Sequence, residues 1–248
     1  MTKLSVTFLG NLNQDRPAQR SVLPALAHSA AGLGCELDVR CINPLDTTPR
    51  IQPSDAFFVG TGAPDEPTAN ILRHIQYARE HNVPCIGTCG GSQRMIMEFA
   101  QNVLRLENIE HAELDPEAQD PLFTPLACSL KGQRAPIELI EHSQMRHWYG
   151  QNTVEEEHYC AYGLNEQYLP AIEQAGLKVA GRSLDGEIRA LELTGHPFFL
   201  ATAYVPQVSS SPKAPHLLIT AWLNAAISHR QTVNGKHVRE NAKGIAYN

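Results

Sequence analysis

Cys89 and the glycines around it are the residues whose types and spacing most suggest chemistry. They lie in Ile-Gly-Thr-Cys-Gly-Gly-Ser-Gln, residues 86–93, where Gly87, Gly90 and Gly91 surround the cysteine in the order G-x-C-x-G. A nucleophile on a sharp turn between a strand and a helix needs small neighbours, because the turn is strained and crowded. The N-terminus of the following helix lowers a thiol pKa. The pattern predicts a reactive thiol, with a buried structural cysteine as the alternative.

An oxyanion hole is predicted beside this thiol. The backbone N–H of Gly90 would be one donor, and a second would come from Gly62 in the turn Gly60-Thr61-Gly62, which ends an apolar strand. Such donors stabilise the negative charge that develops when a carbonyl is attacked. The same Gly-x-Gly is also a partial dinucleotide-binding pattern, but Pro64 interrupts it and no third glycine opens a helix. We therefore expect no cofactor.

Apolar strands and amphipathic helices alternate in the part of the chain that must position these residues. The expected strands are 4–10, 35–42, 55–60 and 83–87, and the expected helices are 21–34, 67–82 and 92–104. Strand and helix in this order predict a flavodoxin-like α/β fold with a mostly parallel central sheet and flanking helices.

The rest of the chain continues in the same sheet without a linker that would divide it. Residues 105–135 are acidic and contain proline, which predicts a surface excursion. Strands are expected at 135–141, 154–163, 177–183, 187–193 and 197–204, and helices at 165–176 and 215–229. We expect a single domain over residues 1–230, followed by a polar C-terminal tail, residues 231–248, that is disordered.

Composition excludes several classes of function. The net charge is −6, and no run of Lys or Arg stands out, which disfavours nucleic acid and anionic membranes as partners. No apolar run approaches the roughly 20 residues of a membrane helix. The 6 cysteines include no CxxC pair, so neither a disulfide framework nor a metal site is expected. We expect a cytoplasmic protein whose partner is a small-molecule substrate; a homodimer is left open.

At these residues the chain resembles the class I glutamine amidotransferase family, and within it the glutaminase domains of CTP synthases. The resemblance covers residues 5–229 and is firmest in Val-Pro-Cys-Ile-Gly-Thr-Cys-Gly-Gly-Ser-Gln, residues 83–93, and in the run from Ala175 to Gln207. It implies the family's α/β fold and a nucleophilic role for Cys89. No amidoligase segment precedes the match, so we expect a stand-alone relative that is not itself a CTP synthase.

The chain departs from the family where the resemblance implies the rest of the catalytic triad. The family has His-Pro-Glu after the last long strand, the His acting as general base and the Glu orienting it. Here the segment is Val205-Pro206-Gln207, and neither Val205 nor Gln207 can take that role. The family's Arg for the glutamine carboxylate corresponds to Ala161. Glutamine is therefore not the expected substrate.

Other matched positions imply contacts with the substrate. Gln93 corresponds to the family's glutamine on the substrate side, and Tyr162 corresponds to a family tyrosine. The residues expected at the substrate are Thr61, Gln93, Cys160 and Tyr162.

His158 is the candidate to replace the missing base. It corresponds to a family position near the substrate, and Cys160, two residues later, stands where the family has His. In a strand the two side chains would share one side with Glu156 and point at Cys89. A surface or internally bonded histidine is the alternative, and Glu155–Glu157 would most simply be a solvated run of charge.

Three kinds of function remain open. The leading hypothesis is a cysteine-dependent hydrolase or transferase that acts through Cys89 on a small C–N or carbonyl substrate other than glutamine. The rival is a non-catalytic module that binds a metabolite or regulates a partner, and a redox thiol protein is third. Cys128 is a further thiol that could reach the site, although structural packing is the favoured interpretation.

Overall fold

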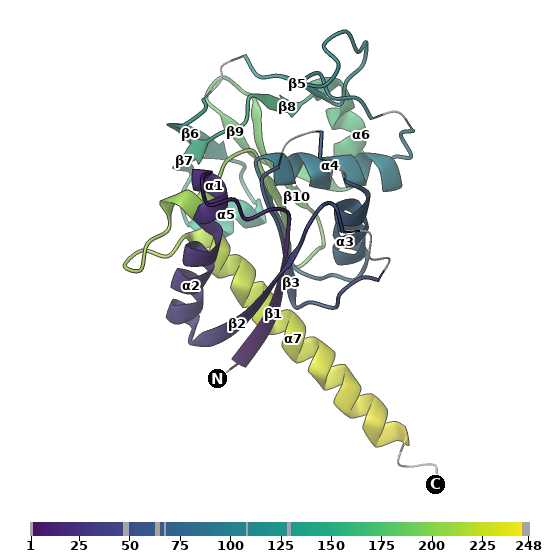
Figure 1. Cartoon of the computed structure of the whole chain (residues 1–248), viewed down its shortest axis with the longest axis vertical. Helices are drawn as coiled ribbons and strands as arrows, with labels where there is room; N and C mark the ends of the chain where they lie inside the picture. The colour runs from purple at the N-terminus through teal and green to yellow at the C-terminus, as the bar shows by residue number, and fades with distance from the viewer. Residues whose placement is uncertain are drawn as a thin grey trace.

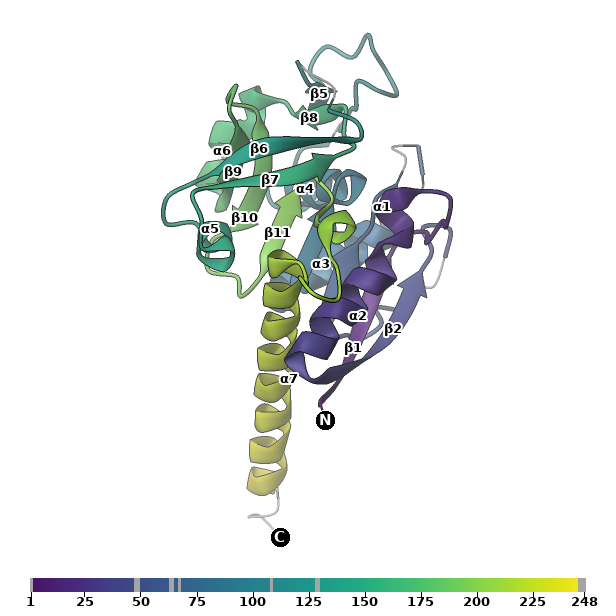
Figure 2. The same ribbon diagram turned by 90° about the vertical axis from the view of Figure 1, so that its left-hand side faces the viewer.

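The computed structural model describes residues 2–46, 50–62, 65–66, 68–107, 109–127 and 130–244, with side chains described as far as residue 235. Cys128 lies outside the described residues, so its predicted place near the site is not tested. A central nine-stranded sheet has the order β2-β1-β3-β4-β11-β10-β9-β6-β7 (Figures 1 and 2).

The strands that carry the site run parallel. They are β1 (Thr2–Leu9), β2 (Cys35–Ile42), β3 (Ala56–Val59), β4 (Cys85–Thr88) and β11 (Phe199–Thr202). Antiparallel pairing extends the sheet through β10 (Ile188–Leu193), β9 (Leu177–Ser183), β6 (Gln133–Leu139) and β7 (Thr153–His158). A separate pair joins β5 (Phe123–Pro125) to β8 (Tyr162–Leu164). The alternation of strands and helices thus predicted the fold class correctly.

Helices cover both faces of the sheet. On one face lie α2 (Val22–Leu33), α5 (Gln144–Tyr149) and α7 (Leu217–Gly244) (Figure 2). The short α1 (Pro17–Arg20) directly precedes α2 in the chain. On the other lie α3 (Ala69–Glu80), α4 (Gly90–Asn102) and α6 (Leu169–Gln174). Two 3₁₀ turns span Glu166–Tyr168 and Pro206–Ser209. The predicted end of α2 is confirmed, because Gly34 takes φ 63° and donates to the last carbonyls of the helix.

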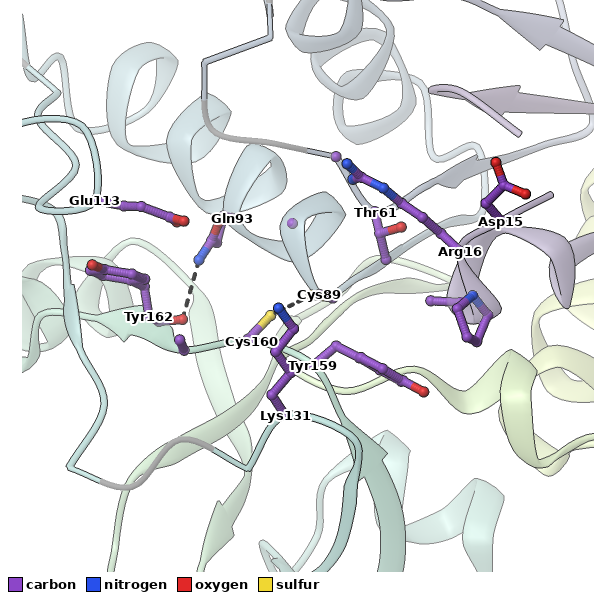
Figure 3. A pocket seen from close by; sticks show the side chains of 15 residues that line it. Asp15, Arg16, Thr61, Cys89, Gln93, Glu113, Lys131, Tyr159, Cys160 and Tyr162 are labelled. Atoms are coloured by element: carbon purple, nitrogen blue, oxygen red, sulfur yellow. Dashed lines mark hydrogen bonds between the residues drawn. The ribbon is translucent and has the colours of Figure 1, made fainter. Parts of the chain in front are cut away.

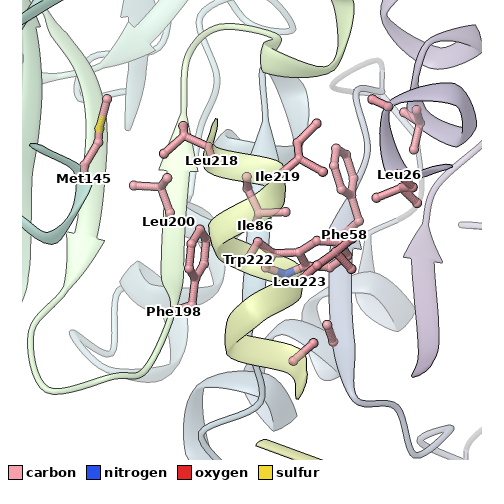
Figure 4. Close-up of a cluster of buried hydrophobic side chains, with 14 of the residues drawn as sticks. Leu26, Phe58, Ile86, Met145, Phe198, Leu200, Leu218, Ile219, Trp222 and Leu223 are labelled. Atoms are coloured by element: carbon pink, nitrogen blue, oxygen red, sulfur yellow. The ribbon is translucent and has the colours of Figure 1, made fainter. Parts of the chain in front are cut away.

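Aromatic and aliphatic side chains fill the space between α7 and the sheet (Figure 4). Trp222 of α7 is fully buried, and its ring lies 5.8 Å from that of Phe58 in β3, nearly perpendicular to it. Burying a side chain of this size contributes about 2–3 kcal/mol. The packing holds the β3 end of the sheet rigid, and the turn with Thr61 and Gly62 follows directly.

Helix α7 corrects the prediction for the C-terminal segment. The helix continues from Leu217 to Gly244, where a disordered tail was expected from residue 231, and it extends past the body of the molecule (Figure 1). Residues 231–235 are exposed, so tertiary packing does not hold them. A helix that is already nucleated against the core needs no new nucleus in order to continue. Across the described residues, no helix combines the length and the apolarity that crossing a bilayer requires.

Candidate active site around Cys89

Cys89 occupies the junction between β4 and α4 in a conformation rare for a residue with a side chain. Its φ is 50° and its ψ is −117°, a backbone state that costs about 1–3 kcal/mol. Its N–H donates to the carbonyl of Thr202 in β11 (2.8 Å), and its own carbonyl accepts from the hydroxyl of Ser92 (2.6 Å). These bonds hold the strained turn and turn the thiol out of the sheet.

The glycines beside Cys89 are required by close backbone approach. A β-carbon at Gly91 would lie 2.1 Å from the carbonyl oxygen of Val59, and one at Gly87 would lie 2.5 Å from the sulfur of Met95. At Gly90 it would lie 2.5 Å from the carbonyl oxygen and 3.0 Å from the nitrogen of Gly62. The predicted tight strand–helix turn is therefore present, with Gly62 directly against Gly90.

A cavity of about 530 Å³ opens above the thiol (Figure 3). Its described lining contains the sequence-predicted residues Thr61, Gly62, Cys89, Gly90, Gln93, Cys160, Ala161 and Tyr162. Ligands of α/β proteins bind at this edge, outside the carboxyl ends of parallel strands. The volume is within the range for sites that hold small molecules, roughly 300–1,000 Å³.

Charged side chains that the sequence did not reveal also line this cavity: Asp15, Arg16, Glu113 and Lys131, together with Tyr159. They come from the loop before α1, from the excursion at 105–135 and from the loop after β7. No local pattern marks them, because distant segments meet only after folding. The one indication in the sequence was the predicted edge of the sheet where strands lead into helices, because the loops that line a site lie at that edge.

The sulfurs of Cys89 and Cys160 lie 2.7 Å apart, and Cys160 is the donor. The pKa of Cys89 is lowered, chiefly by this hydrogen bond; burial opposes the shift, while the amide of Gly90 and the charge of Lys131 add to it. The pKa of Cys160 is raised well above its usual value by the same hydrogen bond and by burial. Of the two thiols, Cys89 is therefore the one that loses its proton more readily, and Cys160 the one that keeps it.

Gln93 bridges the wall of the cavity. Its Nε2 donates to the carbonyl of Tyr162 (3.2 Å, Figure 3), and its Oε1 lies 3.4 Å from Nε2 of His111. Burial lowers the pKa of His111 to about 4, so this ring is neutral at pH 7. The contacts join α4 to the segment that carries Cys160 and Tyr162.

Val205 and Gln207 lie in the core and are not among the described residues that line the cavity. Val205 is fully buried, and the amide nitrogen of Gln207 donates to the carbonyl of Ala18 (3.0 Å) and the hydroxyl of Thr88 (3.2 Å). Gln207 therefore ties the segment after β11 to α1 and β4.

His158 does not face the cavity, which corrects the expected orientation toward Cys89. It is 1% exposed, is absent from the described lining, and its ring lies 5.9 Å from that of Tyr204. Neither ring nitrogen makes a well-formed hydrogen bond to a described residue. Burial, with a further contribution from the charge of Arg189, lowers its pKa to about 4. Strand β7 ends at His158, so the next residues turn Cys160 toward the thiol while His158 stays inside.

The run Glu155–Glu157 is also only partly solvated. Strand parity is confirmed, because Glu156 shares the buried side with His158 while Glu155 is exposed. The Oε1 of Glu156 accepts from the hydroxyl of Tyr149 (2.6 Å) and lies 2.9 Å from Nε2 of His216. This carboxylate therefore belongs to an internal polar network beneath the sheet edge. Within the part of the chain that the structure describes, no group of three or more His, Cys, Asp or Glu side chains could hold a metal ion.

Comparisons with known proteins agree with this architecture. The family model "Glutamine amidotransferase class-I" matches residues 18–225. A CTP synthase from Cyanothece sp. is 29% identical over 251 residues, which cover 94% of this chain and 45% of that protein, so the chain spans about half of that relative.

Solved structures show the same fold. The glutaminase domain of Trypanosoma brucei CTPS, with bound acivicin, superposes with a TM-score of 0.81 at 23% identity, over 91% of this chain and 94% of that one. A glutamine amidotransferase from Methylobacillus flagellatus gives 0.57 at 13% identity, over 94% and 96% of the two chains. On the match to the family model over most of its length, the chain belongs to the class I glutamine amidotransferase family.

Proposed function

We propose that the protein is a cysteine-dependent hydrolase or transferase that acts on a small C–N or carbonyl substrate other than glutamine. The observation that carries the proposal is the strained position of Cys89 on the floor of a small-molecule cavity, with its pKa lowered. Cys89 would attack the carbonyl carbon, form a thioester and release the leaving group. The amides of Gly90 and Gly62 would stabilise the intermediate oxyanion.

The choice against glutamine rests on three residues. The CTP synthase relative favours a glutaminase-type activity, but Val205 and Gln207 occupy the positions that the family resemblance gives to the base and its partner. Ala161, to which the family resemblance assigns the position of the carboxylate-binding Arg, lines the cavity. A leaving amine must be protonated, and general acid–base catalysis of that step contributes roughly 10²–10⁴ in rate. A substrate with a better leaving group needs less of this help.

The proposal is tested by mixing the protein with p-nitrophenyl acetate and following p-nitrophenolate. We expect a burst of one equivalent, because acylation of Cys89 needs no proton donor for this leaving group. The burst disappears in Cys89→Ser. It persists in the matched control Cys41→Ser, because Cys41 is an exposed residue of β2 that does not line the cavity. A burst that survives in Cys89→Ser, or ammonia release from glutamine that Cys89→Ala abolishes, would overturn the assignment.

A binding module is the second candidate, favoured by the lining itself. The described lining includes no histidine, while it offers the cations Arg16 and Lys131 and the anions Asp15 and Glu113. Such a set suits a zwitterionic metabolite. On this alternative wild type gives no ester burst, and an amino acid raises the melting temperature equally in wild type and Cys89→Ala.

A further inference from the structure

Two cysteines that are far apart in sequence meet at the floor of the cavity. Cys89 follows β4, and Cys160 lies in the loop between the end of β7 at His158 and the start of β8 at Tyr162. Their sulfurs are 2.7 Å apart, about 0.7 Å more than the roughly 2.05 Å of a covalent S–S bond. Both side chains line the same cavity, so a group bonded to the sulfur of Cys89 would lie beside Cys160 (Figure 3).

The two thiols are chemically unequal in the way that a dithiol reaction needs. Cys89 has the lowered pKa and is the nucleophile, whereas Cys160 is held as a thiol by the hydrogen bond that it donates. Once the sulfur of Cys89 is bonded to another atom, it no longer accepts as a thiolate. The largest contribution that raises the pKa of Cys160 is then gone, and the buried guanidinium of Arg189 still favours its ionised form against the effect of burial.

We propose that this site also carries out thiol–disulfide exchange with a small disulfide, Cys89 acting as the attacking cysteine and Cys160 as the resolving cysteine. The Cys89 thiolate attacks one sulfur of R–S–S–R, the Cys89–S–S–R bond forms, and R–S⁻ leaves. Cys160 then gives its proton to R–S⁻ and attacks the sulfur of Cys89. A Cys89–Cys160 bond forms and the second R–S⁻ leaves, to be protonated by water. Two protein thiols are oxidised and one disulfide is reduced to two thiols.

The lining indicates the class of disulfide. The cavity of about 530 Å³ is lined by two cationic side chains, Arg16 and Lys131, and by two anionic ones, Asp15 and Glu113. A disulfide that carries both ammonium and carboxylate groups, of the amino-acid type, complements such a lining in charge and size.

This reaction is separate from acyl transfer, and either can fail without the other. An ester burst needs only the sulfur of Cys89, whereas the exchange needs both sulfurs. Formation of the Cys89–Cys160 bond is therefore diagnostic of the exchange alone.

The test uses the whole chain in its reduced form, in the Cys41→Ser background, which removes an exposed thiol outside the site. The protein is mixed with L-cystine, the reaction is stopped by alkylation, and peptides are mapped without reduction. We expect a peptide pair joined through Cys89 and Cys160. In Cys160→Ser, which keeps a hydroxyl donor, the reaction stops with cysteine attached to Cys89. In Cys89→Ser, Cys160 stays unmodified over the same time.

Three results would overturn the proposal. They are stable cysteinylation of Cys89 in the presence of Cys160, no reaction of either thiol with cystine, and first attack by Cys160 in Cys89→Ser. The joined peptide pair is measured without any substitution at the site, so poor folding of a variant does not decide the outcome.

Discussion

The substitution Gly91→Ala probes how far the reactivity of Cys89 depends on the packing of the strand–helix turn. The added β-carbon would lie 2.1 Å from the carbonyl oxygen of Val59 and 2.8 Å from that of Gly60. Real β-carbons almost never come within 3.0 Å of such atoms, so helix α4 must move by about 0.9 Å. Both obstacles are backbone atoms at the end of β3, a strand paired on both sides, and backbone atoms cannot rotate out of the way as a side chain can.

The cost of this overpacking is about 3 kcal/mol in the free energy of unfolding, the upper part of the usual range. For a chain of this size that corresponds to a fall in melting temperature of about 6–12 °C. The same movement displaces the N-terminus of α4 and the Gly90 amide from the sulfur of Cys89. A displacement of about 1 Å at a reacting group can cost 10²-fold in rate, so we expect alkylation of Cys89 to slow at least tenfold.

The matched control is Gly32→Ala on the exposed side of α2, where an added β-carbon meets nothing within 4 Å. It should stabilise the protein by about 0.5–1 kcal/mol, as alanine does in a helix interior, and leave Cys89 alkylation unchanged. The measurements are denaturant unfolding and peptide-resolved alkylation by iodoacetamide. If Gly91→Ala unfolds within about 0.5 kcal/mol of wild type, the size of an ordinary surface change, and alkylates at the wild-type rate, the turn is not the close-packed support described above.

Two further predictions concern titration. At pH 6.5, limiting iodoacetamide should label Cys89 before the exposed Cys41, because the pKa of Cys89 is lowered whereas partial desolvation of the sulfur raises the pKa of Cys41. First labelling of Cys41 would contradict this. His158 has a folded-state pKa of about 4, below its unfolded value of about 6.5. Between these two pH values the unfolded chain binds more protons at His158 than the folded chain does. The free energy of unfolding therefore falls as the pH drops from 6.5 to 4. In His158→Leu, the slope of the unfolding free energy against pH, measured from pH 6.5 to 4, should decrease by up to the amount that one bound proton contributes. An unchanged slope would show that His158 does not titrate in this way.

The sequence predicted the thiol turn well because the signal is local. Glycines on both sides of Cys89 report contacts made by the backbone next to them, and Gly34 reports the left-handed end of α2. Strand alternation likewise put Glu156 and His158 on one side of β7, as found. These features depend on a few consecutive residues, so a pattern can carry them.

The partners of the thiol were harder to predict because they depend on where a strand stops. Alternation alone treats 154–163 as one strand and therefore puts the side chains of His158 and Cys160 on the same side of it. In the structure β7 ends at His158, and the loop that follows brings Cys160 to Cys89 while His158 packs on Tyr204. Lys131 and Glu113 come from the long excursion, whose fold is fixed by tertiary contacts rather than by its composition.

The turn that carries Cys89 and the segment 205–207 are packed by different sets of contacts. Cys89 is held by β4, α4 and the turn after β3, through its backbone bonds, the hydroxyl of Ser92 and the glycine contacts. That segment packs inside, with Gln207 bonded to Ala18 and Thr88. With Val205 and Gln207 packed in this way, the turn at Cys89 keeps its strained conformation and the thiol its lowered pKa. Under the proposed function, such a site favours substrates whose leaving group departs as a stable anion, such as an aryl oxide or a thiolate.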